Sequence, residues 1–187
     1  LPSLACLALI VLAGCGGADP EDAPLVERIE GREARQIALL TSDPYDFVAA
    51  RAGPPRETRI TGRLRFPGEG TPIRGAAILS HGSGGPGGRQ ERMADWLAER
   101  GVASLLLDHF GARGIGSTVE DQLRVTEQTM LADIAHARAL LATHPEIPAG
   151  RIGMIGWSKG ALGVTLGAVD RLAGFVDLAA PAPAFAV

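Results

Sequence analysis

The sequence predicts a single domain of the α/β class, in which a largely parallel sheet carries helices on both faces. The chain has 187 residues, of which 46% are apolar and 21% charged. This is enough to form the core of about one domain. From residue 76 onward, short apolar runs alternate with segments of helical periodicity. Such alternation is typical of parallel strands joined by helices, and it places ligands at the carboxyl ends of the strands.

The predicted elements follow from the positions of the apolar residues. Apolar and polar residues alternate over residues 60–66, which indicates a half-buried strand. Continuous apolar runs indicate buried strands at residues 76–79, 102–107, 152–155 and 174–176. Apolar residues at helical spacing indicate helices around residues 93–97, 130–141 and 161–168. Residues 25–53 have mixed helical character and predict no definite element.

The N-terminal residues resemble an export signal. Residues 1–14, LPSLACLALIVLAG, form an apolar run too short to span a bilayer as a mature helix. Residues 12–15, LAGC, resemble the lipobox of bacterial lipoproteins, in which the cysteine becomes the lipid-bearing N-terminus after cleavage. The resemblance implies lipid attachment at Cys15 and a location in the bacterial cell envelope, facing outside the cytoplasm. A buried N-terminal helix with an ordinary core cysteine is the alternative.

The sequence divides into three parts. We expect a signal peptide over residues 1–14, a lipid-anchored linker and poorly defined segment over residues 15–40, and the N-terminal portion of the α/β domain over residues 41–187. No Met and no basic residue precedes the apolar run, so we expect the sequence to lack its first residues. After cleavage Cys15 would be the sole cysteine, which leaves no intramolecular disulfide.

The net charge of the chain and the spacing of its potential metal ligands exclude some classes of binding partner. The net charge is −3, with Lys, Arg, Asp and Glu interspersed, so the sequence offers no basic stripe for nucleic acid. A small molecule and the membrane surface remain as partners. No pair of His, Cys, Asp and Glu residues has zinc-binding spacing, and we expect no metal and no cofactor. No feature of the sequence predicts an oligomeric state.

A glycine-rich loop forms the first motif. Residues 80–88, SHGSGGPGG, contain five of the chain's 25 glycines, and backbone this open commonly surrounds an anion. The loop includes G-x-G-x-x-G, and Asp108 ends the next strand where a ribose-binding acid would lie, so a dinucleotide site is one interpretation. Against it, His81 and Pro86 crowd the loop, and an exported protein would not meet the cytosolic nucleotide pool. The other interpretation is an anion that exists only during a reaction.

The second motif favours that transient anion. Residues 156–160, GWSKG, fit G-x-S-x-G and lie between a predicted strand and a predicted helix. A serine in this sharp turn takes up a strained conformation that exposes its hydroxyl, and larger side chains at the flanking glycines would clash. The N-terminus of the following helix adds a positive dipole end near a developing oxyanion. The pattern predicts that Ser158 is a catalytic nucleophile, and a plain structural turn is the alternative.

Three motifs, taken in order, resemble the α/β-hydrolase superfamily, and most closely its dienelactone hydrolase-like members. The resemblance covers residues 57–187 and implies an α/β-hydrolase fold. Three motifs in this order are a more specific sign of the family than any one motif alone. The motifs are HGSGG at 81–85, DHFGARG at 108–114 and HPEIPAGRIGMIGWSKG at 144–160.

The resemblance also implies a reaction and its residues. Ser158 would be the nucleophile, and the backbone N–H groups of Ser83 and Lys159 would form the oxyanion hole. The substrate would be a small-molecule ester, with lactone and thioester bonds as further candidates. Many dienelactone hydrolases carry cysteine where this chain has Ser158, and often a second glycine where it has Ala161. The serine shifts the expectation towards ordinary esters.

The chain contains no obvious base for this serine. A base must accept the serine proton and an acid must orient the base, and in this superfamily both follow the nucleophile. The four histidines all precede Ser158, and Asp177, which follows it, lies within an apolar strand. We therefore expect acid and histidine to lie beyond Val187, in a C-terminally truncated sequence that is inactive by itself. The alternative is a non-catalytic lipoprotein that binds ligands on a hydrolase scaffold.

Two further side chains lie close to the motifs. Arg113 either meets a substrate carboxylate or holds its loop through an ion pair with Asp108, and we favour the structural role because charged loop residues most often serve the loop. The Lys159 side chain is expected to be solvated, since only its backbone N–H is needed.

Overall fold

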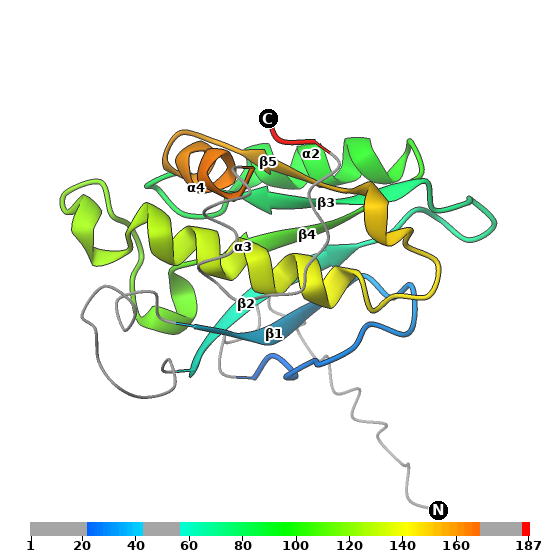
Figure 1. Cartoon of the computed structure of the whole chain (residues 1–187), viewed down its shortest axis with the longest axis horizontal. Coiled ribbons are helices and arrows are strands. Elements are labelled where there is room, and N and C mark those ends of the chain that lie inside the picture. The colour runs from blue at the N-terminus through cyan, green and yellow to red at the C-terminus, as the bar shows by residue number, and fades with distance from the viewer. Residues whose placement is uncertain (1–21, 43–56, 169–184) are drawn as a thin grey trace, which may run out of the picture.

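The computed structural model describes residues 22–42, 57–168 and 185–187 (Figure 1). Their strands form one sheet in the order β1-β2-β4-β3-β5. β2 runs antiparallel to β1 and β4, whereas β3 runs parallel to β4 and β5. The strands are β1 (Arg35–Ser42), β2 (Glu57–Arg65), β3 (Gly75–Ser80), β4 (Val102–Asp108) and β5 (Ile152–Gly156). The predicted largely parallel sheet is confirmed, with β2 as the one reversed strand among those described.

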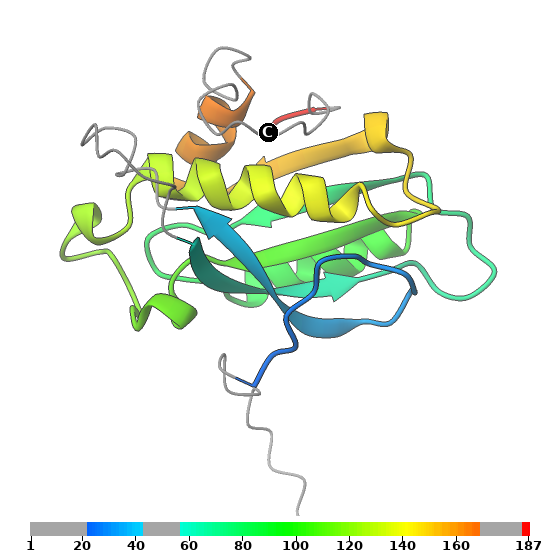
Figure 2. The same cartoon turned by 60° about the horizontal axis from the view of Figure 1, so that its bottom comes forward.

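Helices cover both faces of the sheet, as predicted (Figures 1 and 2). On one face, Ala94 and Leu97 of α2 pack in a cluster with Leu79. On the other, Ile134 of α3 and Val164 of α4 belong to the larger core. The helices are α2 (Gly88–Ala98), α3 (Glu127–Leu141) and α4 (Lys159–Gly167), with short 3₁₀ turns η1 (Gly111–Arg113), η2 (Gln122–Arg124) and η3 (Ala149–Arg151).

Capping residues set the limits of the helices that flank the site. Gln90 Oε1 accepts a hydrogen bond from Gly87 N at 3.1 Å, which satisfies a free amide at the start of α2. The chain leaves α2 through Gly101, whose φ of 78° suits a residue without a Cβ. Thr126 begins α3 by accepting from Thr129 N at 3.3 Å. The glycine loop therefore enters α2 directly, with Gly87 as its N-cap.

The helical character expected for residues 25–53 is wrong for the residues of β1. Residues 35–42 form a strand that pairs antiparallel with β2. The sequence QIALL favours a helix by local propensity, but pairing with β2 buries Ile37, Ala38 and Leu39 together. Ile29 is also fully buried in the main core. The boundary drawn at residue 41 falls inside β1, and the packed domain begins earlier.

Some sequence predictions concern residues outside the described ranges. The strand predicted at 174–176, the signal over 1–14 and Cys15 are among them. Within the part of the chain that the structure describes, no helix is long and apolar enough to cross a membrane.

Candidate active site

The G-x-S-x-G segment forms a sharp turn between β5 and α4. Ser158 is the N-cap of α4, with φ 50° and ψ −116°. It is the one non-glycine residue with a positive φ among those described. Such a backbone conformation costs about 1–3 kcal/mol at a residue with a Cβ, and it persists where surrounding contacts enforce it. Ser158 is also exposed. The turn thus contains a strained and accessible serine, as the motif predicted.

Glycines let this turn pack against the loop that follows β3. A Cβ on Gly160 would lie 2.3 Å from Ser80 O and 2.4 Å from His81 O. A Cβ on Gly82 would lie 3.2 Å from the Cβ of Ser158. Backbone atoms cannot move aside as the tip of a flexible side chain can, so the contact at Gly160 excludes every larger residue. The two glycine motifs of the sequence are therefore the two sides of one contact.

Two free backbone amides lie beside this contact. Strand pairing places Ser80 opposite Gly156, and Trp157 N donates to Ser80 O at 3.0 Å. Within the described residues, no acceptor takes the N–H of Ser83 or the N–H of Lys159. The amide of Lys159 is free because it is the first of α4, where no helical carbonyl precedes it. Free N–H donors close to the reacting serine are one requirement of an oxyanion hole.

His81 fixes the glycine loop from within the protein. Its side chain is fully buried, its Nδ1 lies 2.7 Å from Gly82 O, and its Nε2 accepts from His109 N at 3.1 Å. Since a backbone N–H can only donate, Nε2 carries no proton and Nδ1 donates to the carbonyl. Burial, together with the nearby His109 ring, lowers the pKa of His81 to about 4. His81 is therefore neutral near pH 7.

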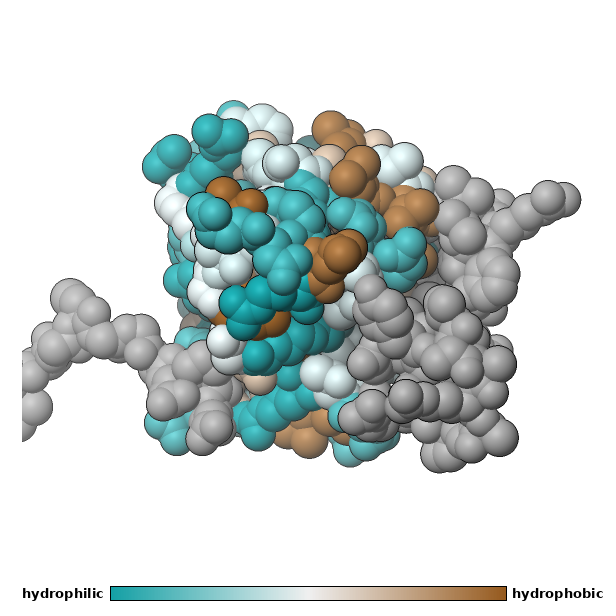
Figure 3. Space-filling model, turned by 90° about the vertical axis from the view of Figure 1, so that its left-hand side faces the viewer, coloured by the Kyte–Doolittle hydropathy of each residue, from teal (hydrophilic) through white to brown (hydrophobic). Residues whose placement is uncertain are grey.

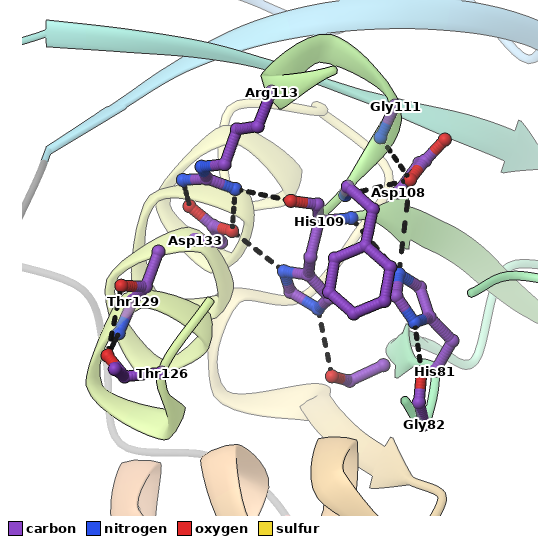
Figure 4. A network of polar contacts seen from close by, with 11 residues as sticks. His81, Gly82, Asp108, His109, Gly111, Arg113, Thr126, Thr129 and Asp133 are labelled. Atoms are coloured by element: carbon purple, nitrogen blue, oxygen red, sulfur yellow. Dashed lines mark hydrogen bonds and ion pairs between the residues drawn. The ribbon is translucent and has the colours of Figure 1, made fainter. Parts of the chain in front are cut away.

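A chain of buried polar groups continues from the loop into α3 (Figure 4). Ser80 Oγ lies 2.9 Å from His109 Nε2, and His109 Nδ1 lies 2.7 Å from Asp133 Oδ2. Arg113 holds both oxygens of Asp133 at 2.8 Å. Burial alone would raise the pKa of Asp133, but the Arg113 charge and the hydrogen bonds from His109 and Arg113 hold it below its usual range.

This chain has the order of a serine, histidine and aspartate triad but not its accessibility. Ser80, His109 and Asp133 are each 0% exposed, so no substrate reaches the Ser80 hydroxyl. We assign the chain a structural role, in which each buried polar group is satisfied by the next. No sequence motif indicated Asp133, because it lies on the buried side of α3, 24 residues from His109.

The fold of the chain is identified by its similarity to solved structures. No model of a known protein family matches the chain, and no curated protein matches it in sequence. Solved structures do match. The α/β-hydrolase GrgF from Penicillium sp. sh18 is 18% identical, with a TM-score of 0.51, and the match covers 74% of this chain and 43% of that one. The chain has the α/β-hydrolase fold.

Two further solved structures are similar to the chain. The 2,6-dihydroxy-pseudo-oxynicotine hydrolase is 20% identical, with a TM-score of 0.50, over 75% of this chain and 35% of that one. A dienelactone hydrolase-like promiscuous phosphotriesterase from metagenomic libraries is 18% identical, with a TM-score of 0.48, over 73% of this chain and 56% of that one. This chain therefore covers between 35% and 56% of the length of each of the three proteins.

The structure gives Arg113 a structural role but a different partner from the one predicted. Its ion pair is with Asp133, and Arg113 Nη1 also donates to His109 O at 2.7 Å. Asp108 instead accepts from the backbone N–H groups of Phe110 and Gly111, each at 2.9 Å. Asp108 precedes a turn and caps it locally, whereas the guanidinium reaches a carboxylate on another element.

The solvated position expected for the Lys159 side chain is wrong. Lys159 is 3% exposed, and its Nζ donates to the carbonyl oxygen of Gln122 and, at 3.2 Å, to Gln122 Oε1. Glu127 Oε1 lies 3.9 Å away. The sequence around the turn could not indicate this, because the segment that covers Lys159 lies more than 30 residues earlier.

The described histidines do not supply a base for Ser158. His81 and His109 are held in the interior, His136 lies 3.2 Å from Ser42 Oγ, and His144 follows the end of α3. No described histidine hydrogen-bonds to the Ser158 hydroxyl, and Asp177 lies outside the described residues. No group of three or more potential metal ligands occurs in residues 22–42, 57–168 and 185–187.

The neutral state of His81 predicts a pH dependence of stability. Because the pKa of His81 is about 4 when folded and about 6.5 when unfolded, its contribution is complete above pH 6.5 and is lost as the pH falls towards 4. We expect the unfolding free energy to fall by about 2 kcal/mol more between pH 7 and 4.5 in the parent than in His81→Gln. Urea unfolding at both pH values measures this difference, since His136 and His144 titrate alike in both proteins. Equal pH dependence would contradict the assignment.

Proposed function

We propose that this protein is a serine hydrolase that cleaves an ester bond of a small molecule, with Ser158 as its nucleophile. The observation that carries the proposal is the backbone of Ser158, which has a positive φ of 50° at an exposed strand-to-helix turn. Strain of this kind is retained where it serves a site. The similar structures with TM-scores of 0.50 and 0.51 are hydrolases, which supports a hydrolase.

The reaction follows from the groups around the turn. Ser158 Oγ attacks the carbonyl carbon of the ester and loses its proton to a base, and the carbonyl oxygen becomes negative. The N–H groups of Ser83 and Lys159 stabilise that oxygen, each contributing about 3 kcal/mol by analogy with other oxyanion holes. The carbon–oxygen bond to the alcohol then breaks, and the alcohol leaves with the proton. Water releases the acid from the acyl-serine in a second, equivalent step.

We also propose that the base and its orienting acid are residues of the full-length product that follow Val187. The support is chemical, since a serine hydroxyl without a base stays protonated and reacts slowly. No described residue fills this role. A lactone or thioester would meet the same machinery, because both present an acyl carbon and a leaving heteroatom.

The surface around the turn is suited to a substrate with an apolar part. Leu162 of α4 is 55% exposed, and Leu123 of η2 is 78% exposed. Leu162 lies one helical turn after Ser158, and Leu123 follows Gln122, which contacts Lys159. On the side of the molecule at the left of Figure 1, apolar surface lies in patches among hydrophilic groups (Figure 3). Aryl esters of short acids are suitable first probes.

Packing of the glycine loop favours the hydrolase over a dinucleotide-binding protein. A Cβ on Gly82 would lie 3.1 Å from Trp157 O and 3.2 Å from Ser158 Cβ. In a dinucleotide site the corresponding close approach would be to a pyrophosphate. A ligand-binding lipoprotein without catalysis is the remaining alternative, and labelling of Ser158 separates the two.

The full-length product, translated from the complete reading frame that contains these residues, should hydrolyse aryl esters and react with a fluorophosphonate at Ser158. The 187-residue chain alone should turn over substrate far more slowly, by several orders of magnitude, because no residue among those described serves Ser158 as a base. Ser158→Ala should abolish labelling and turnover. Ser104→Ala is the control, since the buried Ser104 hydroxyl has no partner among the described residues.

Mass spectrometry of the labelled protein shows which residue carries the probe. Turnover that survives Ser158→Ala would refute the nucleophile, and ligand binding without labelling or turnover would favour the binding protein.

We further propose that the protein is anchored by lipid at Cys15 and faces outside the bacterial cytoplasm. The support is the LAGC sequence at 12–15 and the apolar run before it. Lipid on a single cysteine would hold the domain at a membrane without a spanning helix.

Cys15→Ser should prevent incorporation of labelled fatty acid when the full-length product is expressed in a bacterium. Cys6→Ser is the matched control, because Cys6 lies within the segment that cleavage would remove. Phase separation in detergent should move the parent and Cys6→Ser into the detergent phase and leave Cys15→Ser in the aqueous phase. Equal labelling of all three proteins would overturn the anchor.

A further inference from the structure

The proposed oxyanion hole is assembled from two loops that are far apart in the sequence. Ser83 belongs to the loop after β3, and Lys159 begins α4 after β5. Both N–H groups must lie about 3 Å from the same oxygen, and a misplacement of about 1 Å reduces the rate strongly. A contact that fixes one loop relative to the other therefore has a direct effect on the hole.

One side chain contacts both residues. Gln122 Oε1 accepts from Ser83 Oγ at 2.9 Å and from Lys159 Nζ at 3.2 Å. Lys159 Nζ donates to the backbone carbonyl of Gln122 as well. An amide oxygen has two lone pairs, and here each is used by one half of the proposed hole.

The segment around Gln122 is itself attached to the glycine loop. Ser83 O accepts from Thr118 N at 2.8 Å and from Ser117 Oγ at 3.1 Å. Asp121 caps η2 by accepting from Leu123 N at 3.1 Å, which fixes the turn that presents Gln122. The contact with Lys159 is therefore made from a segment already held against Ser83.

We propose that Gln122 is a positioning residue that holds the two amides of the oxyanion hole in register, an inference that rests on the function proposed above. Gln122 does not touch the substrate carbonyl. It acts through the side chains of Ser83 and Lys159, whose backbone N–H groups bind the oxyanion. This role agrees with the burial of Lys159, since its ammonium donates to Gln122 of the segment that covers it.

The test compares Gln122→Ala with Gln128→Ala in the full-length product. Gln128 is an exposed glutamine on α3, six residues further on, and serves as the matched control. ¹⁵N relaxation should give lower order parameters for both the Ser83 and the Lys159 amide in Gln122→Ala, from a rigid value of about 0.85 in the parent. Gln122→Glu should restore both values, because a carboxylate accepts from the same two donors. Ser83→Ala should loosen the Ser83 amide alone.

The rate of reaction with a fluorophosphonate gives the second readout. In Gln122→Ala the maximal rate of Ser158 labelling should fall about tenfold while the concentration for half-maximal rate stays unchanged, because the donors are displaced and the binding surface is not. Unchanged order parameters, or lower order parameters with an unchanged labelling rate, would overturn the positioning role. If the parent is not labelled at all while both amides loosen in Gln122→Ala, the contact stands and the hydrolase function fails.

Discussion

The close backbone contact between the loop after β3 and the turn after β5 determines the rest of the site. At Gly160 a Cβ would lie 2.3 Å from the backbone oxygen of Ser80, and at Gly82 it would lie 3.1 Å from the backbone oxygen of Trp157. Parallel pairing of β3 with β5 brings the two segments together, and the absence of side chains lets them meet. Within this contact Ser158 has a strained φ of 50°, and the amide of Lys159 is free because it begins α4.

Buried polar groups keep the contact in place. His81 joins the glycine loop to the start of the segment after β4, and Ser80 joins it to His109 and, through Asp133, to α3. Burying these groups is costly unless each is satisfied, and removing one partner would leave the next unpaired. Two of the four histidines are thereby committed to structure. That commitment explains why neither is available as the base for the exposed serine.

Features contained within one motif could be predicted from the sequence. The strand, turn and helix around Ser158, the glycine loop and the buried face of the sheet were all readable from local spacing. Contacts between segments that are far apart in the sequence could not be predicted. Nothing near Arg113 indicated Asp133 on α3, and nothing near Lys159 indicated burial under residues 122–127. β1 was missed because its residues favour a helix locally and become a strand only through pairing with β2.

The structure of the full-length product after reaction with a phosphonate ester would locate both the nucleophile and the oxyanion donors. The phosphorus, which mimics the tetrahedral carbon, should be bonded to Ser158 Oγ. One phosphonyl oxygen should lie about 3 Å from both Ser83 N and Lys159 N. A phosphorus on any other residue, or an adduct at Ser158 whose oxygens all point away from these two amides, would contradict the proposed active site.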